Sequence, residues 1–169
     1  NALLGVPVED IDIATPLRPD DVMRLATAAG LGVHPTGIEH GTVTIVADAH
    51  PFEVTTLRRD IETDGRRAVV AFSQDWREDA ARRDFTMNAL YATADGQVFD
   101  YFGGLEDLAN KRVRFIGNAE ERIREDYLRI LRFFRFNAQY AHGAPDPEGL
   151  TACIAMKDGL ARLSAERIG

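Results

Sequence analysis

One run of twelve residues, 125–136, reads Glu-Asp-Tyr-Leu-Arg-Ile-Leu-Arg-Phe-Phe-Arg-Phe and combines aromatic residues with regularly spaced charges. Arg129, Arg132 and Arg135 recur every three residues behind Asp126. On an α-helix a step of three residues turns the position by about 60° and rises about 4.5 Å. We therefore expect Asp126 and Arg129 to lie side by side, with the later arginines spiralling along half of the helix circumference.

The same run carries an apolar stripe at helical spacing. Positions separated by i, i+4 and i+7 face one side of a helix, and here they are occupied by Ile123, Tyr127, Ile130 and Phe134. The pattern predicts a helix over residues 119–141 that is buried on one side. The other side could contact a base at one end and phosphates at the other. An ordinary amphipathic helix with a solvated arginine face is the alternative.

Composition places the chain among ordinary globular proteins. It has 169 residues, 45% of them hydrophobic, and a net charge of −7, which suits one domain with a helical extension. Residues 111–135 hold eight basic and four acidic side chains, so the positive potential is concentrated there. Cys153 is the single cysteine, which excludes an intrachain disulfide and favours a reducing, cytoplasmic location. No apolar run approaches the roughly 20 residues of a membrane span.

Periodicity predicts a mixed α/β lobe up to about residue 117, followed by helices. Alternating patterns and turn residues predict strands over 8–15, 42–46, 52–57, 90–93, 97–100 and 113–116. Helical signals cover 19–29, 75–88, 119–141 and 150–163. Residues 58–75 carry little periodicity and are interpreted as a loop. Both ends of the chain are expected to continue into a longer protein.

Two aspartates in the first predicted strand are candidate metal ligands. Asp10 and Asp12 alternate with Ile11 and Ile13, so both carboxylates should project from one face of the strand. Mg²⁺ is commonly held by one or two carboxylates together with substrate phosphates, which makes the pair a candidate for phosphoryl-transfer chemistry. Surface charge is the plainer interpretation, and sugar-nucleotide glycosyltransferases use a similar pair.

A second charged segment enters an apolar stretch. Residues 82–90 read Arg-Arg-Asp-Phe-Thr-Met-Asn-Ala-Leu. Charged groups beside a core need a partner, which is either another side chain or a ligand. An internal Arg–Asp pair and a nucleotide contact are equally good explanations of this segment.

Taken together, these segments resemble the class II nucleotidyltransferases, the family of tRNA CCA-adding enzymes and bacterial poly(A) polymerases. The resemblance covers nearly the whole chain and rests on six segments in the family's order: 10–12, 52–58, 64–66, 82–89, 100–104 and 125–136. The segments Glu-Val-Thr-Thr-Leu-Arg and Asp-Gly-Arg are more similar to the CCA-adding branch. The implied fold is α+β: a palm-like mixed sheet with flanking helices forms a head over 1–117, and a helical neck follows over 118–169.

The resemblance also implies a role for individual residues. Asp10 and Asp12 would hold Mg²⁺, and Arg83 would contact the incoming nucleotide. Asp126 and Arg129 would read the base, and Arg132 and Arg135 would extend that contact. The implied partners are CTP, ATP and the 3′ end of tRNA, and pyrophosphate would be released.

Hydrogen-bond chemistry supports the implied base reader. An ionised Asp only accepts hydrogen bonds, and Arg only donates them. Cytosine and adenine each place an amino donor beside a ring-nitrogen acceptor, whereas uracil and guanine place a carbonyl beside a ring N–H. An adjacent Asp126–Arg129 pair would therefore accept C and A and reject U and G.

The sequence departs from the family's pattern at one point. The Gly-Gly-x-Val-Arg-Asp segment, which the resemblance places just before Asp10, is not in these 169 residues. Two alternatives to CCA addition stay open, namely a poly(A) polymerase that uses ATP alone and an inactive nucleotide- or RNA-binding fragment.

Overall fold

A computed structural model describes residues 2–5, 7–8, 11–63 and 68–168, with the side chains of 61–63 and 68–70 excepted. The chain forms two compact units. Unit 1 comprises residues 1–59 and 70–79, and unit 2 comprises residues 60–69 and 80–169. Each unit is described by itself.

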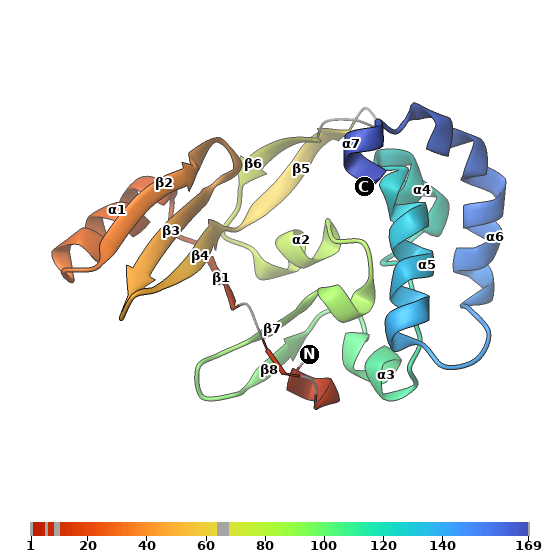
Figure 1. Cartoon of the computed structure of the whole chain (residues 1–169), viewed down its shortest axis with the longest axis horizontal. Coiled ribbons are helices and arrows are strands. Elements are labelled where there is room, and N and C mark those ends of the chain that lie inside the picture. Colours follow the sequence, from red (N-terminus) through yellow and green to blue (C-terminus); the bar gives the residue numbers. More distant parts are fainter. Residues whose placement is uncertain (1, 6, 9–10, 64–67, 169) are drawn as a thin grey trace. The chain divides into compact units, whose positions relative to one another are not determined.

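Unit 1 contains a four-stranded mixed sheet in the order β1-β4-β3-β2 (Figure 1). The strands are β1 (Asp12–Thr15), β2 (Gly32–Gly37), β3 (Thr42–Ala47) and β4 (His50–Thr56). β1 pairs with β4 in parallel, and the β2–β3 and β3–β4 pairs are antiparallel. The predicted hairpin is confirmed, and its turn residues Asp48 and Ala49 have φ of 49° and 63°, the left-handed pair of a type I′ turn. β2 was not predicted, because its Gly and Pro residues hide the strand pattern.

One face of this sheet is apolar and packs on the helix α1 (Pro19–Ala28). Val22 of α1 meets Val43 and Val54 in a buried cluster, with Met23, Val33 and Ile45 packed around it. The alternation of strand side chains leaves the polar residues of β1, β3 and β4 for the opposite face.

The segment after the sheet differs from its prediction as a loop. It forms the two-stranded sheet of β5 (Arg58–Thr63) and β6 (Ala68–Phe72). The apolar run of β6 was a strand signal, but the charges before it hid the pairing. The turn predicted at residues 64–67 lies outside the described residues.

The helix predicted over 75–88 is shorter in the structure. The helix α2 (Trp76–Ala81) ends before Arg82, and a separate 3₁₀ helix covers Thr86–Asn88. The Asp84 carboxylate accepts the backbone N–H of Phe85, and such local side-chain bonds compete with helical ones.

Unit 2 continues with a short hairpin and a capped helix. β7 (Leu90–Ala92) pairs with β8 (Val98–Asp100), and α3 (Gly104–Ala109) follows. The Asp100 carboxylate accepts four backbone N–H groups, from Phe102, Gly103, Gly104 and Leu105. Burial acts to raise the pKa of Asp100, but these hydrogen bonds together lower it below its usual value. The strand predicted over 113–116 is reduced to a bridge between Phe85 and Phe115.

The helix predicted over 119–141 is broken into α4 (Ala119–Glu125) and α5 (Leu128–Tyr140). Asp126 is extended at the break, with φ −155° and ψ 108°, and its carboxylate accepts the N–H of Leu128. Beyond α5 lie α6 (Pro147–Met156), a 3₁₀ helix (Lys157–Arg162) and α7 (Ala165–Ile168). The single helix predicted over 150–163 is therefore also wrong, because its second half is 3₁₀.

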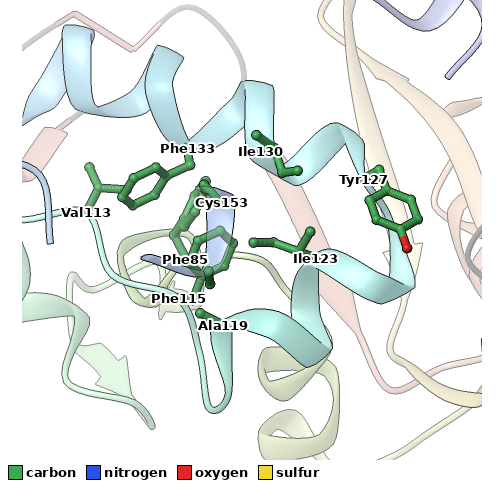
Figure 2. Close-up of a cluster of buried hydrophobic side chains, with 10 residues drawn as sticks. Phe85, Val113, Phe115, Ala119, Ile123, Tyr127, Ile130, Phe133 and Cys153 are labelled. Atoms are coloured by element: carbon green, nitrogen blue, oxygen red, sulfur yellow. The ribbon is translucent and has the colours of Figure 1, made fainter. Parts of the chain in front are cut away.

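Aromatic residues fill the core of unit 2 (Figure 2). The Phe115 ring lies 4.9 Å from that of Phe85 and is stacked 5.4 Å from that of Phe133. Phe133 is fully buried, whereas Phe134, predicted to be buried, is 46% exposed. The side of α5 that faces the core is therefore the side of Phe133, which packs against Phe85 and Phe115. This core contains residues from both sides of residue 117, and the division into head and neck there remains a prediction.

None of the helices in the described ranges is long and apolar enough to cross a bilayer.

Gly104 allows α3 to approach the 3₁₀ helix closely. A Cβ at this position would lie 2.3 Å from the Thr86 carbonyl oxygen, which is backbone and cannot turn away. We expect Gly104→Ala to lower the free energy of unfolding by about 2 kcal/mol through overpacking. Chemical denaturation checks this, with the exposed α3 residue Glu106 changed to Ala as the control. Equal unfolding midpoints for the two variants would contradict the prediction.

Candidate nucleotide- and metal-binding residues

The polar face of the unit 1 sheet carries the first predicted site residue. Asp12 is paired in register with Glu53 on β4, and Glu53 is paired with Thr44 on β3. Residues opposite one another on neighbouring strands project to the same face, so these three share the face away from α1. Asp12 and Glu53 are both exposed. The other predicted metal ligand, Asp10, lies outside the described residues.

The chemistry of this face suits a hard cation. Carboxylate oxygens are preferred ligands of Mg²⁺, which keeps several waters and needs few protein ligands. Among the described residues, which do not include Asp10, no group of three or more His, Cys, Asp or Glu residues is placed to hold a metal. Asp12 therefore fits a metal site open to solvent, and its role there stays a prediction.

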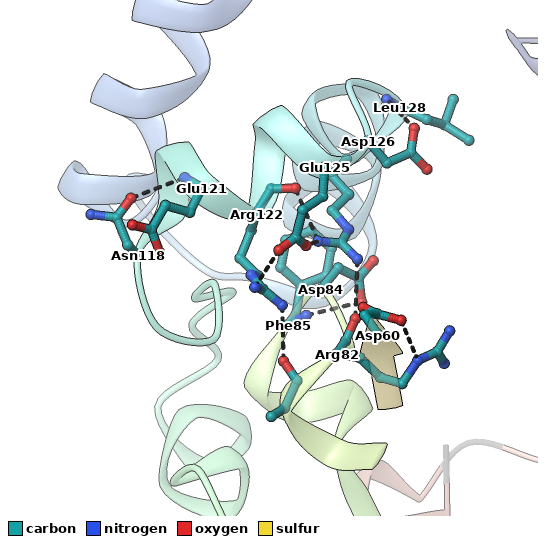
Figure 3. Close-up of polar contacts among 12 residues, drawn as sticks. Asp60, Arg82, Asp84, Phe85, Asn118, Glu121, Arg122, Glu125, Asp126 and Leu128 are labelled. Carbon is teal, nitrogen blue, oxygen red and sulfur yellow. Dashed lines mark hydrogen bonds and ion pairs between the residues drawn. The ribbon is translucent and has the colours of Figure 1, made fainter. Parts of the chain in front are cut away.

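In unit 2, Arg129 belongs to a polar network whose members Glu125, Arg122 and Arg82 are labelled in Figure 3. Its guanidinium donates to the Glu125 carboxylate at 2.6 Å, the Arg122 carbonyl at 2.9 Å and the Arg82 carbonyl at 3.0 Å. Only 14% of the Arg129 side chain is exposed. A guanidinium with three such acceptors is held in one orientation before any nucleotide arrives.

Glu125 also accepts a hydrogen bond from Arg122, and Arg122 in turn donates to the Ala81 carbonyl at 3.0 Å. Glu125 and Arg122 were not among the predicted site residues. The i, i+4 spacing of Glu125 and Arg129 was a usable signal for their pairing. The link to residues 81 and 82 depends on the tertiary fold and has no such signal.

Asp126 lies beside this network. One carboxylate oxygen accepts the Leu128 N–H at 3.0 Å, and the other accepts Nη2 of Arg167 at 2.8 Å. The backbone N–H of Arg129 donates to the Asp126 carbonyl at 3.0 Å. The two residues predicted to read the base are therefore neighbours, although across a helix break and not along one helix.

Arg132 contacts the charged segment that follows α2. Its Nε donates to Asp84 at 2.6 Å, and its guanidinium lies 5.3 Å from the centroid of the Phe136 ring. Asp84 also accepts from Asn88 at 2.9 Å, and its side chain is only 8% exposed. The internal Arg–Asp pair considered from the sequence is thus present, and it joins Asp84 to an arginine 48 residues away.

The remaining arginines have separate surroundings. The Arg83 guanidinium lies 5.8 Å from the centroid of the Tyr91 ring, within the range of a cation–π contact. Arg82 pairs with Asp60 at 3.1 Å. Arg135 is exposed and lies 5.7 Å from the Phe136 ring centroid. The structure therefore brings Asp126 next to Arg129, whereas Arg132 belongs to a separate group with Asp84 and Arg135 lies exposed beside Phe136.

Residues 1–114 match the family model described as the poly A polymerase head domain. The chain belongs to this family. Its members are nucleotidyltransferases that generally depend on a divalent metal ion. The predicted fold class is confirmed, since the four-stranded mixed sheet and flanking helices match the head of a CCA-adding enzyme.

The chain is similar to curated and solved CCA-adding enzymes along almost its whole length. It is 48% identical over 169 residues to the mitochondrial CCA tRNA nucleotidyltransferase 1 of Homo sapiens, covering 98% of this chain and 39% of that protein. It is 45% identical over 168 residues to the CCA-adding enzyme of Oceanobacillus iheyensis, covering 98% of this chain and 41% of that protein. The chain thus spans about two fifths of the length of these relatives.

Solved structures are similar over the same extent. The Bacillus stearothermophilus CCA-adding enzyme in complex with CTP superposes with a TM-score of 0.85 at 39% identity, covering 98% of this chain and 39% of that one. A tRNA nucleotidyltransferase complexed with a primer tRNA and an incoming ATP analog gives a TM-score of 0.77 at 28% identity, covering 98% of this chain and 47% of that one.

Loss of the Asp84 carboxylate should destabilise unit 2. Asp84→Ala leaves three donors without their acceptor, those of Phe85, Asn88 and Arg132. We expect the free energy of unfolding to fall by about 3 kcal/mol, the low end for a broken buried pair, since Arg132 is 34% exposed.

Thermal and chemical unfolding would measure this change. The matched control is Asp21→Ala, which removes an exposed ion pair with Arg24 and should cost less than about 1 kcal/mol. If Asp84→Ala lowers the free energy of unfolding no more than the control does, Asp84 does not hold residues 82–90 in place.

Proposed function

We propose that the protein containing this chain adds C and A residues to the 3′ end of tRNA from CTP and ATP, with release of pyrophosphate. The observation that carries the proposal is the match of 98% of the chain, at a TM-score of 0.85, to a CCA-adding enzyme in complex with CTP. The arrangement in unit 2 agrees with it, because a buried donor and a partly exposed acceptor lie next to one another at Arg129 and Asp126.

The proposed roles divide between the units. Asp10 and Asp12 of unit 1 would hold Mg²⁺, which when bound supplies charge neutralisation for the triphosphate and activates the 3′ hydroxyl. Residues of unit 2 would bind the nucleotide: Arg83, Asp126, Arg129, Arg132 and Arg135. In-line attack on the α-phosphorus requires positioning and electrostatic stabilisation and no covalent intermediate.

Base selection follows from the fixed orientation of Arg129. Its three acceptors hold the guanidinium, so little conformational entropy is lost when it donates to the ring nitrogen of C or A. Asp126 then accepts from the amino group of the same base. Uracil and guanine would set a ring N–H against Arg129 and a carbonyl against Asp126, which leaves both groups unpaired.

A poly(A) polymerase that uses ATP alone is the second candidate, because the matching family model is named for the head domain of such enzymes. A cytoplasmic location also stays a proposal, since one relative is named as mitochondrial.

The two candidates differ in their use of CTP. We expect the complete protein, given tRNA that lacks its CCA end, to incorporate C from CTP before A from ATP. Labelled products resolved at single-nucleotide length check this, with an unrelated RNA of equal length as the control. Exclusive use of ATP on both RNAs would establish the poly(A) polymerase instead.

Asp12→Ala tests the metal site and the second alternative to CCA addition, an inactive nucleotide- or RNA-binding fragment. We expect Mg²⁺-dependent transfer to fall by more than about a hundredfold, the usual cost of removing a group that stabilises transition-state charge. The exposed α1 residue Asp20, changed to Ala, is the control and should keep full activity. Unchanged Mg²⁺-dependent nucleotide affinity and transfer in Asp12→Ala would exclude Asp12 as a ligand.

A further inference from the structure

The Asp126 carboxylate is held from two sides by groups far apart in the sequence. The Leu128 N–H reaches one oxygen, and the Arg167 guanidinium of α7 reaches the other across 41 residues. A single hydrogen bond leaves a carboxylate free to rotate about its last torsion, which is broad for Asp. Two donors on different oxygens fix the plane of the group.

Arg129 is held by other residues. Its acceptors come from α4 and from the segment after α2, whereas the Asp126 carboxylate accepts from Leu128 and Arg167. The donor half and the acceptor half of the pair therefore have independent supports. Changing Arg167 should disturb only the acceptor half.

We propose that Arg167 is a positioning residue that orients the Asp126 carboxylate and thereby raises selectivity for C and A over U and G. This inference rests on the proposed function and adds a residue to it. Arg167 acts through Asp126, because its guanidinium occupies one lone-pair direction of the carboxylate oxygen that does not accept from Leu128. The remaining direction is then available to the amino group of a bound base.

A purely structural role for Arg167 is less consistent with the surrounding contacts. The 3₁₀ helix before α7 already packs closely on the helix break, since a Cβ at Gly159 would fall 1.9 Å from the Tyr127 ring. Arg162 lies over the same ring at 5.4 Å. The Arg167–Asp126 pair is 39% and 30% exposed, and an ion pair of that exposure contributes little to folding.

Arg167→Ala in the complete protein tests the proposal. We expect the ratio of kcat/KM for CTP to that for UTP to fall about tenfold, the effect of losing one hydrogen bond to a charged group. Arg167→Lys, which keeps the charge but only one donor nitrogen, should lie between this variant and the unchanged protein. Arg124→Ala is the matched control, because Arg124 pairs with Glu120 on the exposed side of α4, and its ratio should not change.

A double-mutant cycle separates positioning from folding. In an Asp126→Ala background, Arg167→Ala should have no further effect on the relative affinities for CTP and UTP measured by equilibrium binding. The proposal is overturned if Arg167→Ala leaves the ratio of kcat/KM for CTP to that for UTP unchanged. It is also overturned if Arg167→Ala keeps its full effect on the relative nucleotide affinities in the Asp126→Ala background. If the unchanged protein incorporates neither C nor A, the proposed function fails. Incorporation with an unaffected ratio contradicts only the role of Arg167.

Discussion

The guanidinium of Arg129 is the group on which the arrangement of unit 2 depends. It is largely buried and charged, so it needs acceptors among the neighbouring groups. Those acceptors are the Glu125 carboxylate and the carbonyls of Arg122 and Arg82. One side chain thereby joins α4, α5 and the segment that follows α2, and an error in any of these would leave a buried charge unpaired.

The break between α4 and α5 lies at Asp126, three residues before Arg129. Asp126 leaves the helical path and is extended there, while its own carboxylate replaces a helical hydrogen bond at Leu128. The aromatic packing of Phe85, Phe115 and Phe133 holds the segment after α2 against α5. The polar network and the apolar core therefore join the same elements, namely α4, α5 and the segment after α2.

Sequence periodicity and turn residues predicted the elements that are formed by interactions between residues close in the sequence. α1, the β3–β4 hairpin and the β7–β8 pair follow from periodicity and turn residues, and all three are present. The prediction of a single helix over 119–141 was wrong, since it used apolar periodicity alone and the Asp126 side chain competes with the helical hydrogen bond. Phe134 was expected to be buried for the same reason, whereas Phe133 faces the core. β5 and β6 were missed, because the charged residues of β5 hid its pairing with the apolar run of β6.

By itself, the sequence determined the family, the order of the segments and the chemistry available to Asp126 and Arg129, because donor and acceptor character belong to the residue type. The tertiary structure alone decided what holds these groups. Glu125, Arg82 and Arg122 orient Arg129, Arg132 pairs with Asp84, and Arg167 reaches Asp126. Except for the i, i+4 pair of Glu125 and Arg129, these contacts carry no periodic signal. Most of them join residues 40 or more positions apart, which only the packing of the core brings within hydrogen-bonding distance.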